Sequence, residues 1–138
     1  MAKKFINYSV GEKITKSNDS YTTWTNDLLR KLITSKTVIN PGKTTGGHRL
    51  IESEVVFVFL SGFGEVEIIE YSNHEAGHGS NPSFGIEHKE DIKVRAGDIL
   101  LAEEGDLLAA FDASGNVRGV AVQLIPPFGP YEGQIVYE

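Results

Sequence analysis

Short runs of β-branched and aromatic residues, most of them ended by glycine or proline, constrain the fold of this chain more than any other feature. The clearest run is VVFVFL (55–60), which Ser61 to Gly64 separate from a second run, EVEII (65–69). Later runs are DIKV (91–94), DILLA (98–102), LLAAF (107–111) and VRGVAVQLI (117–125). Such spacing is typical of sandwiches and barrels. The sequence therefore predicts an all-β fold, with a hairpin that turns at Gly62 and Gly64.

The length of the chain favours one domain, because 138 residues suffice for a single core. Residues 1–27 are polar, so we expect them to form an N-terminal segment outside the main barrel. Residues 126–138 include three of the five prolines, so we expect a C-terminal arm that pairs with a partner subunit.

Composition narrows the partners and cofactors. The net charge of −6, without clusters of Lys and Arg, argues against a nucleic-acid partner. The longest apolar run, Val55 to Leu60, is too short to cross a bilayer, so we expect a cytoplasmic protein with no membrane contact. The absence of cysteine excludes disulfides and thiolate zinc sites, which leaves histidine and carboxylate as possible metal ligands.

The stretch HEAGH (74–78) matches the H-E-x-x-H pattern of zinc proteases. That pattern binds zinc only when a helix presents both histidines on one face. Three glycines and a proline surround His74 and His78, with no helical periodicity, so a helix is not expected. We interpret this segment as a loop between two strands.

Two motifs resemble those of the cupin family. In residues 41–68, five residues separate Gly42 from His48, and Leu50, Glu54 and an apolar strand ending at Ser61-Gly62 follow. In RAGDILLAEEGDLLAAFD (95–112), the matching positions are Gly97-Asp98, Glu103, Gly105, Leu108 and Asp112. Together the motifs cover most of residues 37–125. The resemblance implies a small double-stranded β-barrel (jelly roll), often dimeric, whose mouth holds a ligand or a metal.

The family's usual metal ligands are two histidines and a glutamate from the first motif and a histidine from the second. Here His48 and Glu54 match, whereas Leu50 and Leu108 occupy the other two positions. Since Glu54 lies one residue farther from Gly62 than usual, Glu52 or a bulge could change which carboxylate points inward. A metal would need a loop histidine, either His74, His78 or His88, so we expect no metal cofactor.

The candidate site residues follow from this resemblance and from the polarity pattern. We expect His48 and Glu54 to serve as an acid–base pair, because imidazole titrates near neutral pH. We expect a ligand pocket lined by Leu50, Phe57, Leu108, Asp112 and Gln123.

Four functions stay open on these grounds. The first is binding of a small organic ligand, such as a carbohydrate or its derivative, in an apolar, metal-poor barrel. The second is a sugar phosphate or nucleotide-sugar isomerase or epimerase, in which His48 takes a proton next to a carbonyl and Glu54 assists. The third is a metal-dependent enzyme completed by loop histidines. The fourth is a structural or regulatory module, dimeric through its tail, with Leu50 and Leu108 as ordinary core.

Overall fold

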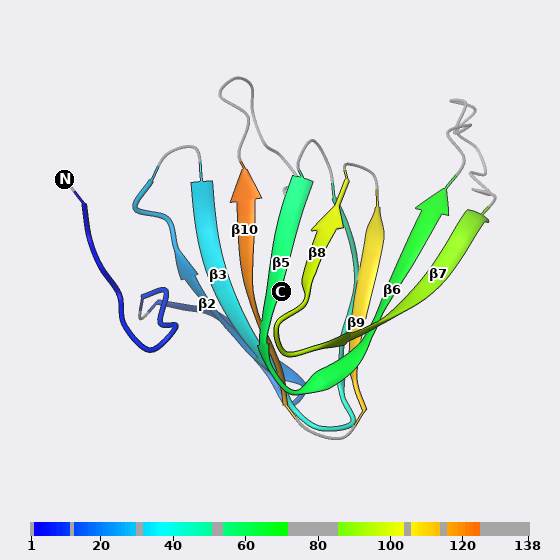
Figure 1. Cartoon of the computed structure of the whole chain (residues 1–138), viewed down its shortest axis with the longest axis horizontal. Helices are drawn as coiled ribbons and strands as arrows, with labels where there is room; N and C mark the ends of the chain where they lie inside the picture. The colour runs from blue at the N-terminus through cyan, green and yellow to red at the C-terminus, as the bar shows by residue number, and fades with distance from the viewer. Residues whose placement is uncertain are drawn as a thin grey trace.

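The structure is a computed structural model that describes residues 2–11, 13–29, 32–50, 54–71, 86–103, 106–113 and 116–124. These residues form two antiparallel sheets and no helix, as the sequence predicts for an all-β fold. Figure 1 shows the two sheets facing each other; they approach at one end of the molecule and diverge at the other. No segment of the described residues is a helix that could span a membrane.

The larger sheet has six strands in the order β1-β2-β3-β10-β5-β8. Its strands are β1 (Ile14–Ser17), β2 (Tyr21–Asn26), β3 (Leu32–Ile39), β10 (Val117–Leu124), β5 (Glu54–Ser61) and β8 (Ile99–Ala102). The smaller sheet has the order β4-β9-β6-β7. Its strands are β4 (Thr44–Arg49), β9 (Leu107–Asp112), β6 (Phe63–Tyr71) and β7 (Ile86–Arg95).

Alternating burial along the strands builds the core between the sheets. In β5, Val55, Phe57 and Phe59 are buried, whereas the residues between them are partly exposed. Successive side chains of a strand point to opposite faces, so these three residues face the other sheet. Residues from both sheets complete the core, among them Ile39, Leu50, Val66, Ile68, Leu108, Val117 and Ala121.

The predicted hairpin between residues 55–60 and 65–69 is wrong, because β5 and β6 belong to different sheets. The chain passes from one sheet to the other at Gly62, which has φ of +83°. A Cβ atom at Gly62 would overlap the carbonyl oxygen of Asn116. Glycine is therefore required at this corner for both its backbone conformation and its lack of a side chain.

Two strands, β1 and β2, form within the polar segment 1–27 that the sequence set apart from the barrel. Hydroxyl groups satisfy one another there: Thr23 bonds Thr37 at 2.9 Å, and Thr25 bonds Thr15 at 2.8 Å. Thr23 and Thr37 are fully or almost fully buried. Polar residues can therefore enter the sheet because their hydrogen bonds are made inside it. The expected C-terminal arm, 126–138, lies outside the described residues.

Candidate functional site

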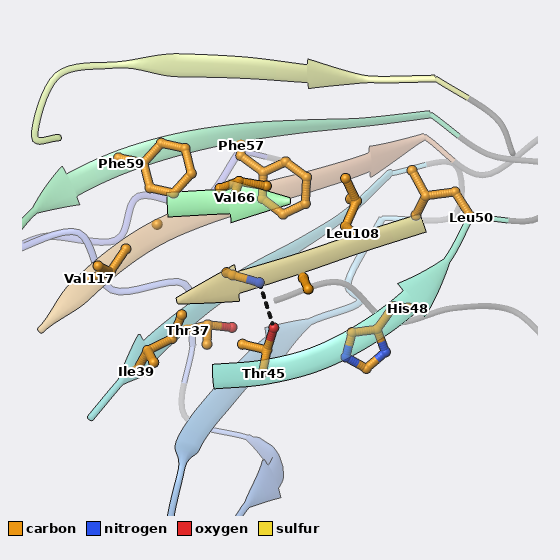
Figure 2. A pocket seen from close by; sticks show the side chains of 13 residues that line it. Thr37, Ile39, Thr45, His48, Leu50, Phe57, Phe59, Val66, Leu108 and Val117 are labelled. Carbon is orange, nitrogen blue, oxygen red and sulfur yellow. Dashed lines mark hydrogen bonds between the residues drawn. The ribbon is translucent and has the colours of Figure 1, made fainter. Parts of the chain in front are cut away.

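A cavity of about 30 Å³ lies between the two sheets, inside the barrel. Figure 2 shows the side chains that surround it. Most of them are apolar and come from strands of both sheets. The lining consists of Thr37, Ile39, Thr45, His48, Leu50, Phe57, Phe59, Val66, Leu108, Ala109, Ala110, Val117 and Gly119.

His48 is brought into this lining by the register of β4 and β9. His48 pairs directly with Leu108, and residues that pair directly across antiparallel strands lie on the same face. An irregularity in the pairing between Thr44 and Gly47 precedes His48, and Gly46 has φ of +83° in that stretch. Just past β4, the backbone N–H of Leu50 donates to the carbonyl of Asp106 at 2.9 Å. This bond holds Leu50 beside Leu108 in the core.

The other polar groups of the lining are two threonine hydroxyls, and both are engaged within the protein. Thr45 Oγ1 accepts a hydrogen bond from the N–H of Ala110 at 3.3 Å and donates to the carbonyl of Gly46 at 3.2 Å. Thr37 Oγ1 pairs with Thr23 Oγ1. His48, whose Nε2 atom is buried, is thus the one titratable side chain in the described lining. A ligand in this cavity would meet an apolar surface with an imidazole at one side.

Glu54 does not lie in the cavity, contrary to its expected pairing with His48. Glu54 is exposed at the start of β5, and its neighbour Val55 is 1% exposed and faces the interior. Side chains of a strand alternate between its two faces, so a shift of one residue relative to the family motif moves Glu54 from the inner face to the outer face. Val55 thus occupies the inward position, consistent with the extra residue between Glu54 and Gly62.

The described interior does not fit a transition metal. Of the four positions where the resemblance expects ligands, His48 alone brings a donor into the cavity, because Leu50 and Leu108 have none and Glu54 is exposed. The alternative carboxylate, Glu52, lies outside the described residues. A protein site for such a metal needs at least three protein ligands. Among the described residues, no group of three His, Asp or Glu side chains could hold one. His74 and His78 lie outside the described residues, and the side chain of His88 is not described.

Five residues, Leu50, Phe57, Leu108, Asp112 and Gln123, were expected to line a ligand pocket. Leu50, Phe57 and Leu108 line the cavity. Asp112 is buried but does not line it, because it lies at the far end of β9, where its backbone bonds Gly42 and Lys43. Gln123 pairs with Val55 and Ile33 through its backbone, and its side chain is outside the described part of the chain.

Several lining residues are not among those predicted from the sequence. Val66 and Val117 have a signal in the sequence, since both alternate with polar or small neighbours in predicted strands. Thr37 and Thr45 have no such signal, because threonine is common on both faces of a strand. The inward position of Thr37 follows from the pairing of β2 with β3, and that of Thr45 from its hydrogen bond to Ala110 within the irregular stretch of β4.

No family model and no curated protein matches this sequence. Solved structures with the same fold do exist. A protein with a double-stranded β-helix domain from Klebsiella pneumoniae is 18% identical, with a TM-score of 0.63, and the alignment covers 91% of this chain and 95% of that one. KdgF from Halomonas sp. is 11% identical, with a TM-score of 0.61 over 83% of this chain and 89% of that chain.

The cupin domain of Cnp3 from Schizosaccharomyces pombe is 10% identical, with a TM-score of 0.62 over 88% of this chain and 74% of that chain. At this level of identity the likeness concerns the fold. The two facing antiparallel sheets, the order of their strands and these three structures agree with the motifs in the sequence. The chain therefore has the cupin fold, a double-stranded β-barrel.

Proposed function

We propose that this chain is a metal-independent binding domain whose barrel takes a small organic molecule. The observation that carries the proposal is the apolar interior cavity with His48 as its one titratable lining group. Ligand sites are commonly concave and mostly apolar, with a few polar groups that fix the orientation of the ligand. The described lining has this composition.

The size and polarity of the cavity restrict the ligand. A cavity needs about 10–15 Å³ to hold one water molecule, so 30 Å³ is room for about two. A ligand of more than a few atoms would require Leu50 or Leu108 to move. It should have an apolar body and one group that hydrogen-bonds an imidazole. A carbohydrate suits this lining poorly, because each buried hydroxyl needs a hydrogen-bond partner.

An isomerase or epimerase that uses His48 and Glu54 together is not supported by this geometry. The two side chains lie on opposite faces of the barrel wall, since His48 lines the interior and Glu54 is exposed outside. Proton transfer by a pair requires both groups within reach of the substrate. If this cavity were catalytic, His48 would be the one acid or base in its described lining.

A second candidate function, a structural or regulatory module with a filled barrel, is favoured by one observation. Leu50 and Leu108 are 1% and 6% exposed and belong to the continuous hydrophobic core. Side chains that pack this closely leave little space for a ligand. In this case the cavity would be an ordinary packing defect.

A thermal-shift screen separates the two candidates. Small molecules with an apolar body and one polar group are tested on the wild type, on Ala110→Val, which fills the cavity, and on His48→Leu, which removes the imidazole. A ligand at 100 times its dissociation constant should stabilise the wild type by about 2.7 kcal/mol. The binding proposal predicts a shift that is lost in Ala110→Val and reduced in His48→Leu. A shift that survives Ala110→Val places the ligand elsewhere, and no shift with any compound favours the filled barrel.

A further inference from the structure

A groove of about 580 Å³ lies beside the N-terminal segment, apart from the barrel cavity. Figure 1 shows this segment in dark blue, at the side of the molecule away from β6 and β7. Asn26 of β2 pairs directly with Thr34 of β3, and both residues line the groove. The rest of the described lining comes from residues within 2–10 and from Leu28, Leu29 and Leu32. None of these residues lines the barrel cavity, so the groove is separate from it.

The groove is mostly apolar, and much of its apolar wall is exposed. Leu28 and Leu29 are 60% and 61% exposed and Phe5 is 45% exposed, whereas Val10 is buried. Contiguous exposed apolar surface of this kind marks an interaction site. The volume of the groove lies within the range of about 300–1,000 Å³ that is typical of small-molecule sites. The wall therefore suits the apolar part of a small ligand.

The polar side chains of the groove have hydrogen-bond donors to offer. The side-chain oxygen of Asn26 accepts the backbone N–H of Leu28 at 2.9 Å, which leaves its NH₂ group to donate. The hydroxyl oxygen of Ser9 accepts the backbone N–H of Gly11 at 3.4 Å, which leaves its proton to donate. Lys3 is exposed and is the one charged residue of the described lining. Donors and a cation together suit an anionic head group.

The distribution of charge along the sequence favours the same kind of ligand. Residues 1–36 contain seven Lys and Arg against three Asp and Glu, a net charge of +4. Residues 37–138 contain six Lys and Arg against 16 Asp and Glu, a net charge of −10. An anion is therefore attracted to the N-terminal side of the molecule, although the chain as a whole is acidic.

We propose that this groove binds a free fatty acid, with its acyl chain along Phe5, Leu28 and Leu29 and its carboxylate at Lys3 and Asn26. An acyl chain brings no polar group that would be left unpaired against the apolar wall. A peptide would bring backbone N–H groups that need acceptors, and the polar side chains of the groove offer chiefly donors. The proposal does not rest on a ligand in the barrel, because a cavity of 30 Å³ is too small for such a chain.

Titration calorimetry of the full chain with dissolved sodium decanoate tests the proposal. One decanoate should bind per chain. Octanoate should bind about fourfold more weakly, because it loses two CH₂ groups that are about half-buried in an open groove. Decyltrimethylammonium, which has a chain of the same length and a cationic head, should bind about five- to tenfold more weakly than decanoate. No binding of decanoate in the millimolar range, or equal binding of the ammonium compound, would overturn the proposal.

Two pairs of variants locate the ligand. Lys3→Glu should weaken decanoate about five- to tenfold and strengthen the ammonium compound, whereas Lys43→Glu makes the same change of charge on an exposed lysine outside the groove and should alter neither. Leu28→Asn should weaken decanoate, and its matched control is Leu101→Asn, since Leu101 is an exposed leucine on β8. All four residues are exposed, so the variants should fold normally. Equal effects within either pair would contradict binding in this groove.

Two other locations for the ligand give distinct results. Ala110→Val fills the barrel cavity and should leave decanoate binding unchanged; loss of binding in this variant would place the ligand in the barrel and overturn the proposal. Vesicles of phosphatidylglycerol present the same combination of acyl chains and negative charge as a membrane surface. A chain that binds these vesicles but not dissolved decanoate would overturn the proposal in favour of membrane docking.

Discussion

Replacing Leu108 by alanine should destabilise the protein strongly, because this side chain is part of both the core and the cavity wall. Leu108 is 6% exposed and pairs with His48 and Ile68 across the two neighbouring strands. Removing three buried carbon groups costs about 2.4 kcal/mol at about 0.8 kcal/mol each. If about 50 Å³ of added cavity stays open, a further 1.2 kcal/mol or so is lost. The total is about 3.5 kcal/mol.

Thermal and urea unfolding, followed by circular dichroism, measure this loss. For a domain of this size, about 3.5 kcal/mol should lower the melting temperature by roughly 10–15 °C. The matched control is Leu29→Ala, since Leu29 is 61% exposed and should change stability by less than about 0.5 kcal/mol. Equal effects of the two substitutions would refute the reasoning, because Leu108 would then contribute no more to the core than a surface leucine.

Three further substitutions test separate parts of the structure. Gly62→Ala should cost more than about 3 kcal/mol in a urea titration, since its Cβ would overlap the backbone of Asn116, just before β10, and its φ is +83°. Thr23→Val should cost about 1–3 kcal/mol, because it leaves the buried hydroxyl of Thr37 without this partner; adding Thr37→Val should recover part of that loss, and no recovery would argue against the pair. A hydrogen bond to the Glu67 carboxylate raises the pKa of Lys89 above 10.5. The contribution of this ion pair to the stability of the fold is therefore present below pH 10.5 and is lost as the pH rises through the raised pKa. Since Lys89 is exposed, Lys89→Gln should barely change the melting temperature at pH 7, and a large drop would contradict this.

Much of the fold is predictable from the sequence, because strand patterns and turn residues act locally. The runs at 55–60, 65–69, 91–94 and 107–111 all lie in strands. The connection at Gly62 is not predictable in this way. The two-residue period is the same whether a chain turns back within one sheet or crosses to the other, so only the packing of the two sheets distinguishes a hairpin from a corner. The strands within 1–27 were missed for a different reason, since β2 contributes one apolar residue, Tyr21, to the core and the next inward position holds Thr23, whose hydroxyl pairs with Thr37.

The site was predictable where the motif fixes a strand position by its spacing. His48, Leu50 and Leu108 lie together in the lining, as the spacing of the two motifs implies. Glu54 illustrates the opposite case. Glu54 and Val55 differ by one position, and only the distance to Gly62 distinguishes which of them faces inward. The size of the cavity could not be predicted, because it depends on how side chains from both sheets fit together.

The central claim is that an apolar interior has taken the place of a metal site, and metal analysis tests it most directly. The full chain is purified without chelators, incubated with zinc, iron, manganese or nickel, dialysed, and measured by elemental mass spectrometry beside His48→Leu. We predict that His48→Leu binds the same amount of metal as the wild type, because the described residues include no group of three His, Asp or Glu side chains that could hold a metal. A metal content near one per chain that is lost in His48→Leu would contradict the account, since the barrel would then hold a metal through His48.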